Sequence, residues 1–215
     1  MSELPNYIVI EGPIGVGKTT LATRIAEDFN AELLLELAEE NPFLEKFYTN
    51  PRQAALPTQL HFLMQRVRQI QAIRQGELFN PVRVADYLLE KDYLFAENTL
   101  DPLELELYEQ VFSQLVLNAP VPDLVVYLQA PTDVLVKRIR KRGRGFEKTI
   151  STTYLQQLSD AYTRFFHYYD KAPLLIVNAT EIDIVNNAQD YQQLLEQVKT
   201  IKTGRHYFNP LPFAM

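Results

Sequence analysis

The feature that most constrains this chain is the octapeptide Gly12–Thr19, which reads Gly-Pro-Ile-Gly-Val-Gly-Lys-Thr. It matches G-x-x-x-x-G-K-T, a loop in which successive backbone N–H groups surround a phosphate. A β-prone run, Tyr7–Glu11, precedes the loop and a run with helical character, 21–26, follows it. The alternative is an ordinary glycine-rich turn before a helix. A chance match to the whole motif in a chain of this length has a probability on the order of one per cent.

We therefore expect this loop to bind a nucleoside triphosphate. The positive end of the helix dipole would face the phosphates. Lys18 would reach the β- and γ-phosphates of ATP, and the Thr19 hydroxyl would bind Mg²⁺. The residues expected to contact ATP are Gly12, Pro13, Ile14, Gly15, Val16, Gly17, Lys18, Thr19 and Thr20.

Short apolar runs recur along the chain, with helical patterns between them. This alternation is typical of a parallel sheet with crossover helices. The runs expected to form strands are 7–11, 33–37, 82–86, 124–128 and 174–178. No linker divides the chain, so we expect residues 1–215 to form one α/β domain, with a tail, 203–215, whose role cannot be derived from the sequence.

Capping residues predict where several helices begin. Asn41, which a proline follows, fits an N-cap with proline at the first helical position. Asp101, with Glu104 three residues later, predicts a capping box. A further helix is expected to begin at Thr58 and to stop at Gly76.

Composition excludes several classes of function. The net charge is −6 and the isoelectric point is near 5.2, which argues against broad electrostatic binding of nucleic acid. The chain has no cysteines, so it has neither a disulfide framework nor a thiolate site. The N-terminus does not resemble a signal peptide, and no apolar run approaches the length of a membrane span. We expect a soluble cytoplasmic protein that binds neither nucleic acid nor membranes.

Two carboxylates lie at the ends of predicted strands. Ligands of parallel α/β sheets gather at the carboxyl ends of the strands, and Glu36 and Asp86 lie at the ends of the second and third strands. Asp86 is expected to bind Mg²⁺ directly or through water. The alternative for Asp86 is the N-cap of a helix that follows the strand.

The segment 137–144 is the one strongly basic stretch. Arg138 and Arg142 are four residues apart on one helical face, and Arg144 follows the break at Gly143. Arginines beside a glycine suit a movable clamp on a transferring phosphoryl group. We favour this phosphate lid over a solvated helix face or a nucleic-acid patch.

One helical face also predicts a ligand pocket. Gln59, Phe62 and Arg66 are spaced at i, i+3 and i+7, so an amide, an aromatic ring and a guanidinium share a face. This combination suits a planar polar ligand. A half-exposed helix face is the alternative.

Together these motifs resemble the deoxynucleoside kinases, in particular the bacterial deoxyadenosine/deoxyguanosine kinase branch. The resemblance runs from Tyr7 to about Asn187, and it includes the segment Asn-Pro-Phe-Leu that begins five residues after Glu36. It implies a P-loop kinase fold with a parallel five-stranded sheet, flanking helices and an Arg-rich lid. It also implies a homodimer that transfers the γ-phosphoryl of ATP to the 5′-hydroxyl of a deoxynucleoside.

The resemblance also assigns roles to residues of the site. Glu36 matches the catalytic base, and Tyr48 and Glu147 match the ligands of the sugar 3′-hydroxyl. Gln59 matches the residue that reads the base, Phe95 matches the residue that stacks on it, and the pair Arg66 and Asp92 matches the one that flanks it. The residues so implied for the nucleoside are Glu36, Tyr48, Gln59, Phe62, Arg66, Asp92, Phe95 and Glu147. Those implied for catalysis are Glu36, Lys18, Arg138, Arg142 and Arg144.

One position departs from the family pattern. After the third strand the family has an acidic residue followed by arginine, whereas this chain has Asp86 followed by Tyr87. The arginine that touches both the phosphate and the catalytic carboxylate is therefore missing. Either Lys91 or a lid arginine replaces it, or activity is lower than in the family.

Two other functions are compatible with the phosphate loop. A nucleoside monophosphate kinase such as thymidylate kinase shares the loop and the lid, but it must clamp an acceptor phosphate. Here Glu36, Glu39 and Glu40 would repel that phosphate. The other alternative is a nucleotide-binding sensor without phosphoryl transfer. No guanine-selective N-K-x-D run supports a switch of the GTPase type.

Overall fold

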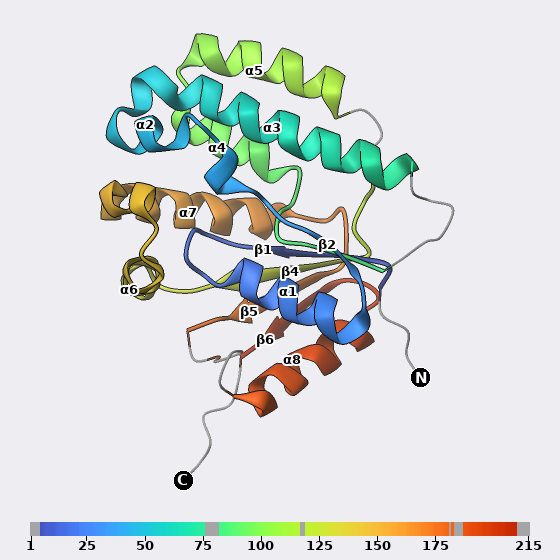
Figure 1. The fold of residues 1–215 in the computed structure, drawn as a ribbon. Helices are drawn as coiled ribbons and strands as arrows, with labels where there is room; N and C mark the ends of the chain where they lie inside the picture. The colour runs from blue at the N-terminus through green and yellow to red at the C-terminus, as the bar shows by residue number, and fades with distance from the viewer. Residues whose placement is uncertain (1–4, 76–81, 117–118, 181, 183–186, 210–215) are drawn as a thin grey trace.

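The computed structural model describes residues 5–75, 82–116, 119–180, 182 and 187–209. Within this part of the chain, one parallel sheet of six strands forms the centre of the molecule (Figure 1). The order across the sheet is β2-β3-β1-β4-β5-β6. The strands are β1 (Tyr7–Glu11), β2 (Glu32–Leu34), β3 (Arg83–Ala85), β4 (Leu124–Gln129), β5 (Leu174–Asn178) and β6 (Arg205–Phe208).

The prediction of five strands was wrong by one. The tail supplies β6, which pairs with β5 in parallel, with Leu174 opposite Arg205. Its sequence, Arg-His-Tyr-Phe, lacks the apolar run of the buried strands because β6 lies at the edge of the sheet and is largely exposed. The fold is otherwise the predicted parallel sheet with flanking helices.

Helices cover both faces of the sheet. In Figure 1, α1 and α8 lie on one face, α7 lies on the other, and α3, α4 and α5 stack beyond it. The helices are α1 (Lys18–Phe29), α2 (Leu44–Thr49), α3 (Pro51–Gln75), α4 (Lys91–Thr99), α5 (Pro102–Leu115), α6 (Thr132–Arg142), α7 (Thr152–Tyr168) and α8 (Ala188–Thr200). Two 3₁₀ turns, η1 (Ala38–Glu40) and η3 (Gly145–Thr149), border the site that is described below.

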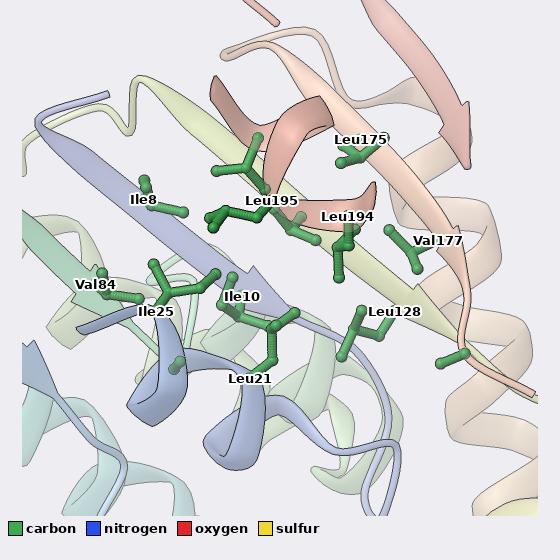
Figure 2. Packing of buried hydrophobic residues seen from close by; sticks show 14 of the residues in the cluster. Ile8, Ile10, Leu21, Ile25, Val84, Leu128, Leu175, Val177, Leu194 and Leu195 are labelled. Carbon is green, nitrogen blue, oxygen red and sulfur yellow. The ribbon is translucent and has the colours of Figure 1, made fainter. Parts of the chain in front are cut away.

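The alternation of side chains along each strand explains the two layers of core. Ile8 and Ile10 of β1 point toward α1 and α8, where they pack in a cluster with Leu21 and Leu194 (Figure 2). Val9 points the opposite way, into the cluster that α4 and α7 complete. Because both faces are covered, each central strand reads as a continuous apolar run rather than as an alternating one.

Two of the predicted helix starts lie elsewhere in the structure. α2 begins at Leu44, and Asn41 instead precedes it in a turn in which its Oδ1 accepts from the Phe43 N–H at 3.1 Å. α3 begins at Pro51 rather than at Thr58, and it continues through Pro57. Packing of Ala54 and other α3 residues against α2 stabilises the turns around this proline, although a proline usually interrupts a helix. The predicted stop at Gly76 lies outside the described residues.

Other local predictions were confirmed. Asp101 caps α5, with its Oδ1 accepting from the Leu103 and Glu104 N–H groups, and the Glu104 side chain accepts from the Asp101 N–H. β3 ends at Ala85, so Asp86 follows the strand directly. β2, however, ends at Leu34 rather than at residue 37, so Glu36 lies in the loop beyond it.

None of the helices in the described part of the chain is both long and apolar enough to cross a membrane.

Candidate active site

The phosphate loop lies between β1 and α1 and packs closely against neighbouring segments. Gly12 and Gly15 have positive φ values of 151° and 84°. A Cβ at Gly12 would lie 2.5 Å from the Leu128 carbonyl oxygen, and one at Gly15 would lie 2.7 Å from a side-chain carbon of Ile139. Both positions therefore require glycine on steric grounds. The Lys18 side chain is bonded back to the loop, because its Nζ donates to the Gly12 carbonyl at 2.6 Å.

Asp86, which directly follows β3, links the first turn of α1 to the loop after β2. Its Oδ2 accepts from the Thr19 hydroxyl at 2.5 Å, and its Oδ1 accepts from the Glu36 N–H at 2.7 Å. The side chain predicted to bind a metal therefore lies against the hydroxyl predicted to bind the same metal. The same carboxylate also fixes the backbone that carries Glu36.

Glu36 lies between two cations. Its Oε1 accepts from Arg66 Nη2 at 2.5 Å, and its Oε2 accepts from Lys91 Nζ at 2.7 Å. Burial alone would raise the pKa of this carboxyl, but Arg66 and Lys91 more than offset burial and lower the pKa to about 2. Glu36 is therefore an anion at neutral pH.

Lys91 connects Glu36 to a second buried carboxylate. Its Nζ also lies 3.8 Å from Glu11 Oε2, and both side chains are almost inaccessible to solvent. Glu11 in turn accepts from the Gly12 N–H at 2.8 Å, the Leu88 N–H at 2.6 Å and the Tyr162 hydroxyl at 2.9 Å. The buried lysine is thus held by two acidic groups, one of which is bonded to the start of the phosphate loop.

Tyr87, at the position where the resemblance implies an arginine, is bonded to Gln69 and has no hydrogen bond to Glu36 among the described contacts. Its ring is buried, and its hydroxyl donates to Gln69 Oε1 at 2.5 Å. Of the replacements that the sequence left open, Lys91 contacts Glu36, whereas the lid arginines Arg142 and Arg144 pair with other carboxylates.

A cleft of about 710 Å³, part of it open to solvent, runs from the phosphate loop to α3. It brings together most of the predicted site residues: Ile14, Gly15, Lys18, Thr19, Glu36, Tyr48, Gln59, Phe62, Asp86, Phe95, Arg142, Arg144 and Glu147. It is also lined by residues that the sequence did not predict as part of the site: Ala38, Leu44, Phe47, Thr58, Phe146 and Tyr154. In the sequence these look like ordinary core or loop positions, so no local signal marks them.

The other predicted residues do not line this cleft: Gly12, Pro13, Val16, Gly17 and Thr20 in and beside the phosphate loop, and Arg66, Asp92 and Arg138 elsewhere. Arg66 and Asp92 form an ion pair behind it, and both are buried. Arg138 donates to the Val16 carbonyl at 3.2 Å and to the Ala179 carbonyl at 2.7 Å, which places it beside the phosphate loop. Arg66 does not line the cleft itself, but its guanidinium contacts Glu36, which does.

The two residues predicted to bind the sugar lie near each other at one side of the cleft. Arg142 holds Glu147 with two bonds, from Nη2 to Oε1 at 2.5 Å and from Nε to Oε2 at 3.1 Å. The ring of Tyr48 is stacked parallel to that of Phe146, at 6.4 Å between centroids. Burial raises the pKa of Tyr48, and neighbouring Tyr154 and Glu147 raise it further, so the phenol stays protonated and can donate a hydrogen bond.

We expect the affinity for ATP to fall above pH 8. Burial and the nearby Lys91 ammonium lower the pKa of Lys18 to about 8, although Glu11, Glu36 and Asp86 oppose this shift. Only the charged form attracts phosphates, and it is lost as pH rises through the pKa. The dissociation constant should therefore rise about tenfold per pH unit above about pH 8. Titration calorimetry with ATP would measure it, and a flat profile from about pH 7 to about pH 9 would contradict the expectation.

A parallel sheet with a phosphate loop at the end of a central strand, and a cleft in which a carboxylate lies between two cations, defines a nucleotide-dependent phosphotransferase of the P-loop class. The family model for deoxynucleoside kinases matches residues 8–202. The chain belongs to the deoxynucleoside kinase family, and it is a phosphotransferase.

Relatives of known name agree with this assignment. Deoxyguanosine kinase of Bacillus subtilis is 37% identical over 204 residues, which cover 91% of this chain and 97% of the relative. Deoxyadenosine kinase of Lactobacillus acidophilus is 30% identical over 209 residues, which cover 89% and 94%. Among solved structures, deoxyadenosine kinase from M. mycoides with bound dATP is 27% identical, with a TM-score of 0.78, and the match covers 90% of this chain and 100% of that one.

Proposed function

We propose that this kinase transfers the γ-phosphoryl group of ATP to the 5′-hydroxyl of a deoxynucleoside, with deoxyadenosine preferred and deoxyguanosine or deoxycytidine next. The observation that carries the proposal is the Glu36 carboxylate, which lies between Arg66 and Lys91 in the same cleft as Lys18 of the phosphate loop. The names of the relatives, which include both purine deoxynucleoside kinases, support the choice of acceptor.

In this reaction Glu36 accepts the proton of the attacking hydroxyl. A carboxyl with a pKa of about 2 is a weak base, but the loose transition state of phosphoryl transfer demands the proton late. Most of the rate enhancement then comes from positioning and from charge on the surrounding cations. Lys18 supplies part of that charge from the phosphate loop.

Mg²⁺ is the metal that the site fits. Thr19 and Asp86 present hard oxygen atoms to each other at 2.5 Å beside the phosphate loop, and oxygen ligands are those that Mg²⁺ prefers. These two residues would hold the ion, which when bound supplies positive charge to the β- and γ-phosphates.

Lys91 is proposed to replace the missing arginine as the cation that contacts the catalytic carboxylate. It is buried at the bottom of the cleft, contacts Glu36 and lies near enough to Lys18 to lower the pKa of that residue. A cation in this place would keep Glu36 ionised and add to the charge around the transferring group. This contact argues against a sensor that has lost catalysis at the Tyr87 position.

Arg142, the last residue of α6, and Arg144, two residues beyond it, are proposed to form the lid. Arg142 and Arg144 line the cleft, and Gly143 between them has a φ of 73° that favours glycine. Arg144 also pairs with the exposed Glu39 at 3.0 Å. Closure here would exclude water and limit hydrolysis of ATP.

The acceptor end of the cleft disfavours a nucleoside monophosphate kinase. Glu36 and Glu147 line it, and Glu39 is paired with Arg144, which also lines it. These carboxylates suit a neutral nucleoside and repel a substrate that carries a phosphate.

We also propose that the chain forms a homodimer through α3 and α5. Leu103 and Leu107 of α5 are 79% and 49% exposed, and Met64 of α3 is 42% exposed. Exposed apolar side chains on two adjacent helices suit a contact with the same helices of a second copy.

Incubation with ATP and each deoxynucleoside, with detection of the monophosphate, tests both the function and the sugar contacts. If Tyr48 and Glu147 bind the 3′-hydroxyl, 2′,3′-dideoxyadenosine should have a kcat/KM at least about tenfold below that of deoxyadenosine, because two buried polar groups lose a partner. Equal values for the two nucleosides would refute the sugar contacts. Failure to form any monophosphate would refute the function.

A further inference from the structure

The amide of Gln59 is held from behind by a threonine of α4. Gln59 lines the cleft and is only 2% exposed. Its Nε2 donates to the Thr99 hydroxyl oxygen at 3.4 Å. The Thr99 hydroxyl donates in turn to the Phe95 carbonyl, one helical turn earlier, at 2.7 Å. These three groups form a short chain of hydrogen bonds that ends on the backbone of α4.

In this series of hydrogen bonds, each donor and each acceptor can be assigned in only one way. A backbone carbonyl can only accept, so the single proton of the Thr99 hydroxyl is committed to Phe95. The Thr99 oxygen can therefore only accept from Gln59, and only the NH₂ end of the amide can face it. If the amide were turned over, its oxygen would face another acceptor and a buried pair would be unsatisfied.

The oxygen of the Gln59 amide is thereby left for a ligand. Among the described residues, no group donates to Gln59 Oε1 within hydrogen-bond distance. Thr99 does not line the cleft, whereas Gln59 does. The amide thus presents its oxygen and its remaining N–H to the cleft, and the two groups cannot exchange positions.

The fixed positions of donor and acceptor matter because adenine and guanine present donors and acceptors in opposite arrangements. Adenine has an amine donor at position 6 beside the acceptor N1, whereas guanine has an oxygen acceptor at position 6 beside the donor N1–H. An amide that is free to turn over can match either pattern, because its oxygen and nitrogen have nearly the same shape. An amide that cannot turn over matches only one.

We propose that Thr99 is a positioning residue that locks the Gln59 amide and so makes the site discriminate between 6-aminopurine and 6-oxopurine deoxynucleosides. The proposal rests on the function proposed above, in which deoxyadenosine is the favoured substrate. It assigns the discrimination to a residue outside the cleft, which acts on the base through Gln59.

The test compares Thr99→Val, which removes the hydroxyl at constant shape, with Thr99→Ser, which keeps it. We expect wild type to favour deoxyadenosine over deoxyguanosine, and Thr99→Val to bring the ratio of the two kcat/KM values about tenfold closer to one. Thr99→Ser should restore the ratio, and KM for ATP should be unchanged in both variants. Thr99→Ala, which adds no methyl group beside Gln59, should shift the ratio as Thr99→Val does.

A purely structural role for Thr99 would lower both kcat/KM values together and leave their ratio unchanged. An unchanged ratio in Thr99→Val and Thr99→Ala, or a serine variant that behaves like the valine variant, overturns the proposal and leaves the kinase activity established. If wild type phosphorylates neither deoxyadenosine nor deoxyguanosine, the proposed preference for deoxyadenosine is wrong, and this inference falls with it; if no deoxynucleoside is phosphorylated, the proposed function is wrong as well.

Discussion

Replacing Glu36 by glutamine is expected to lower kcat by about 10²–10⁴-fold, the range that loss of a general base produces. Glutamine keeps the size of the side chain but cannot take the proton of the 5′-hydroxyl. It also leaves Lys91 and Arg66 without the anion that they share. ATP should bind nearly as before, because Glu36 is not part of the phosphate loop.

Steady-state kinetics with deoxyadenosine, together with calorimetric titration of ATP, would measure these effects. Glu40→Gln is the matched control, because Glu40 lies four residues away, is exposed and carries the same charge. Its turnover should equal that of wild type. A Glu36→Gln enzyme with near-normal turnover would remove Glu36 from the mechanism.

Replacing Lys91 by methionine is expected to reduce both turnover and stability. The change removes the cation between two carboxylates, one of which, Glu11, is fully buried. Breaking a buried ion pair from one side typically costs about 3–5 kcal/mol of unfolding free energy. Loss of a charge that stabilises the transition state typically costs about 10²–10³-fold in kcat. Chemical denaturation and steady-state kinetics would measure the two effects separately.

Two further variants separate charge from packing at this position. Lys91→Arg keeps the charge and should retain more turnover than Lys91→Met. Lys171→Met breaks an exposed pair with Glu90 and should change stability by less than about 1 kcal/mol. If Lys91→Met folds and turns over within threefold of wild type, roughly 0.7 kcal/mol, Lys91 does not contribute to catalysis.

Where a motif carries its own local geometry, the sequence predicted the structure well. The phosphate loop requires a strand before it and a helix after it, so its place in the sheet followed from one motif. The capping box at Asp101 is likewise defined by residues three positions apart. The approach of Thr19 to Asp86 could be expected because parallel strands end at the same edge.

The sequence could not predict features that depend on contacts between distant segments. Lys91 was one of several candidate replacements for an arginine, and only the position of α4 in the folded chain brings it to both Glu11 and Glu36. Arg66 has two acidic partners, and periodicity along α3 cannot tell which of them it reaches. β6 was missed because an edge strand needs no apolar run.

The two bonds of Asp86 bear on how strongly each substrate affects the binding of the other. One of its oxygens is bonded to Thr19 on the ATP side, and the other fixes the backbone of Glu36 on the acceptor side. If ATP and the nucleoside bind as proposed, we expect a shift of this carboxylate at one side to shift the group bonded to its other oxygen. The two binding equilibria are thermodynamically linked, and whatever factor ATP imposes on nucleoside affinity, the nucleoside must impose on ATP.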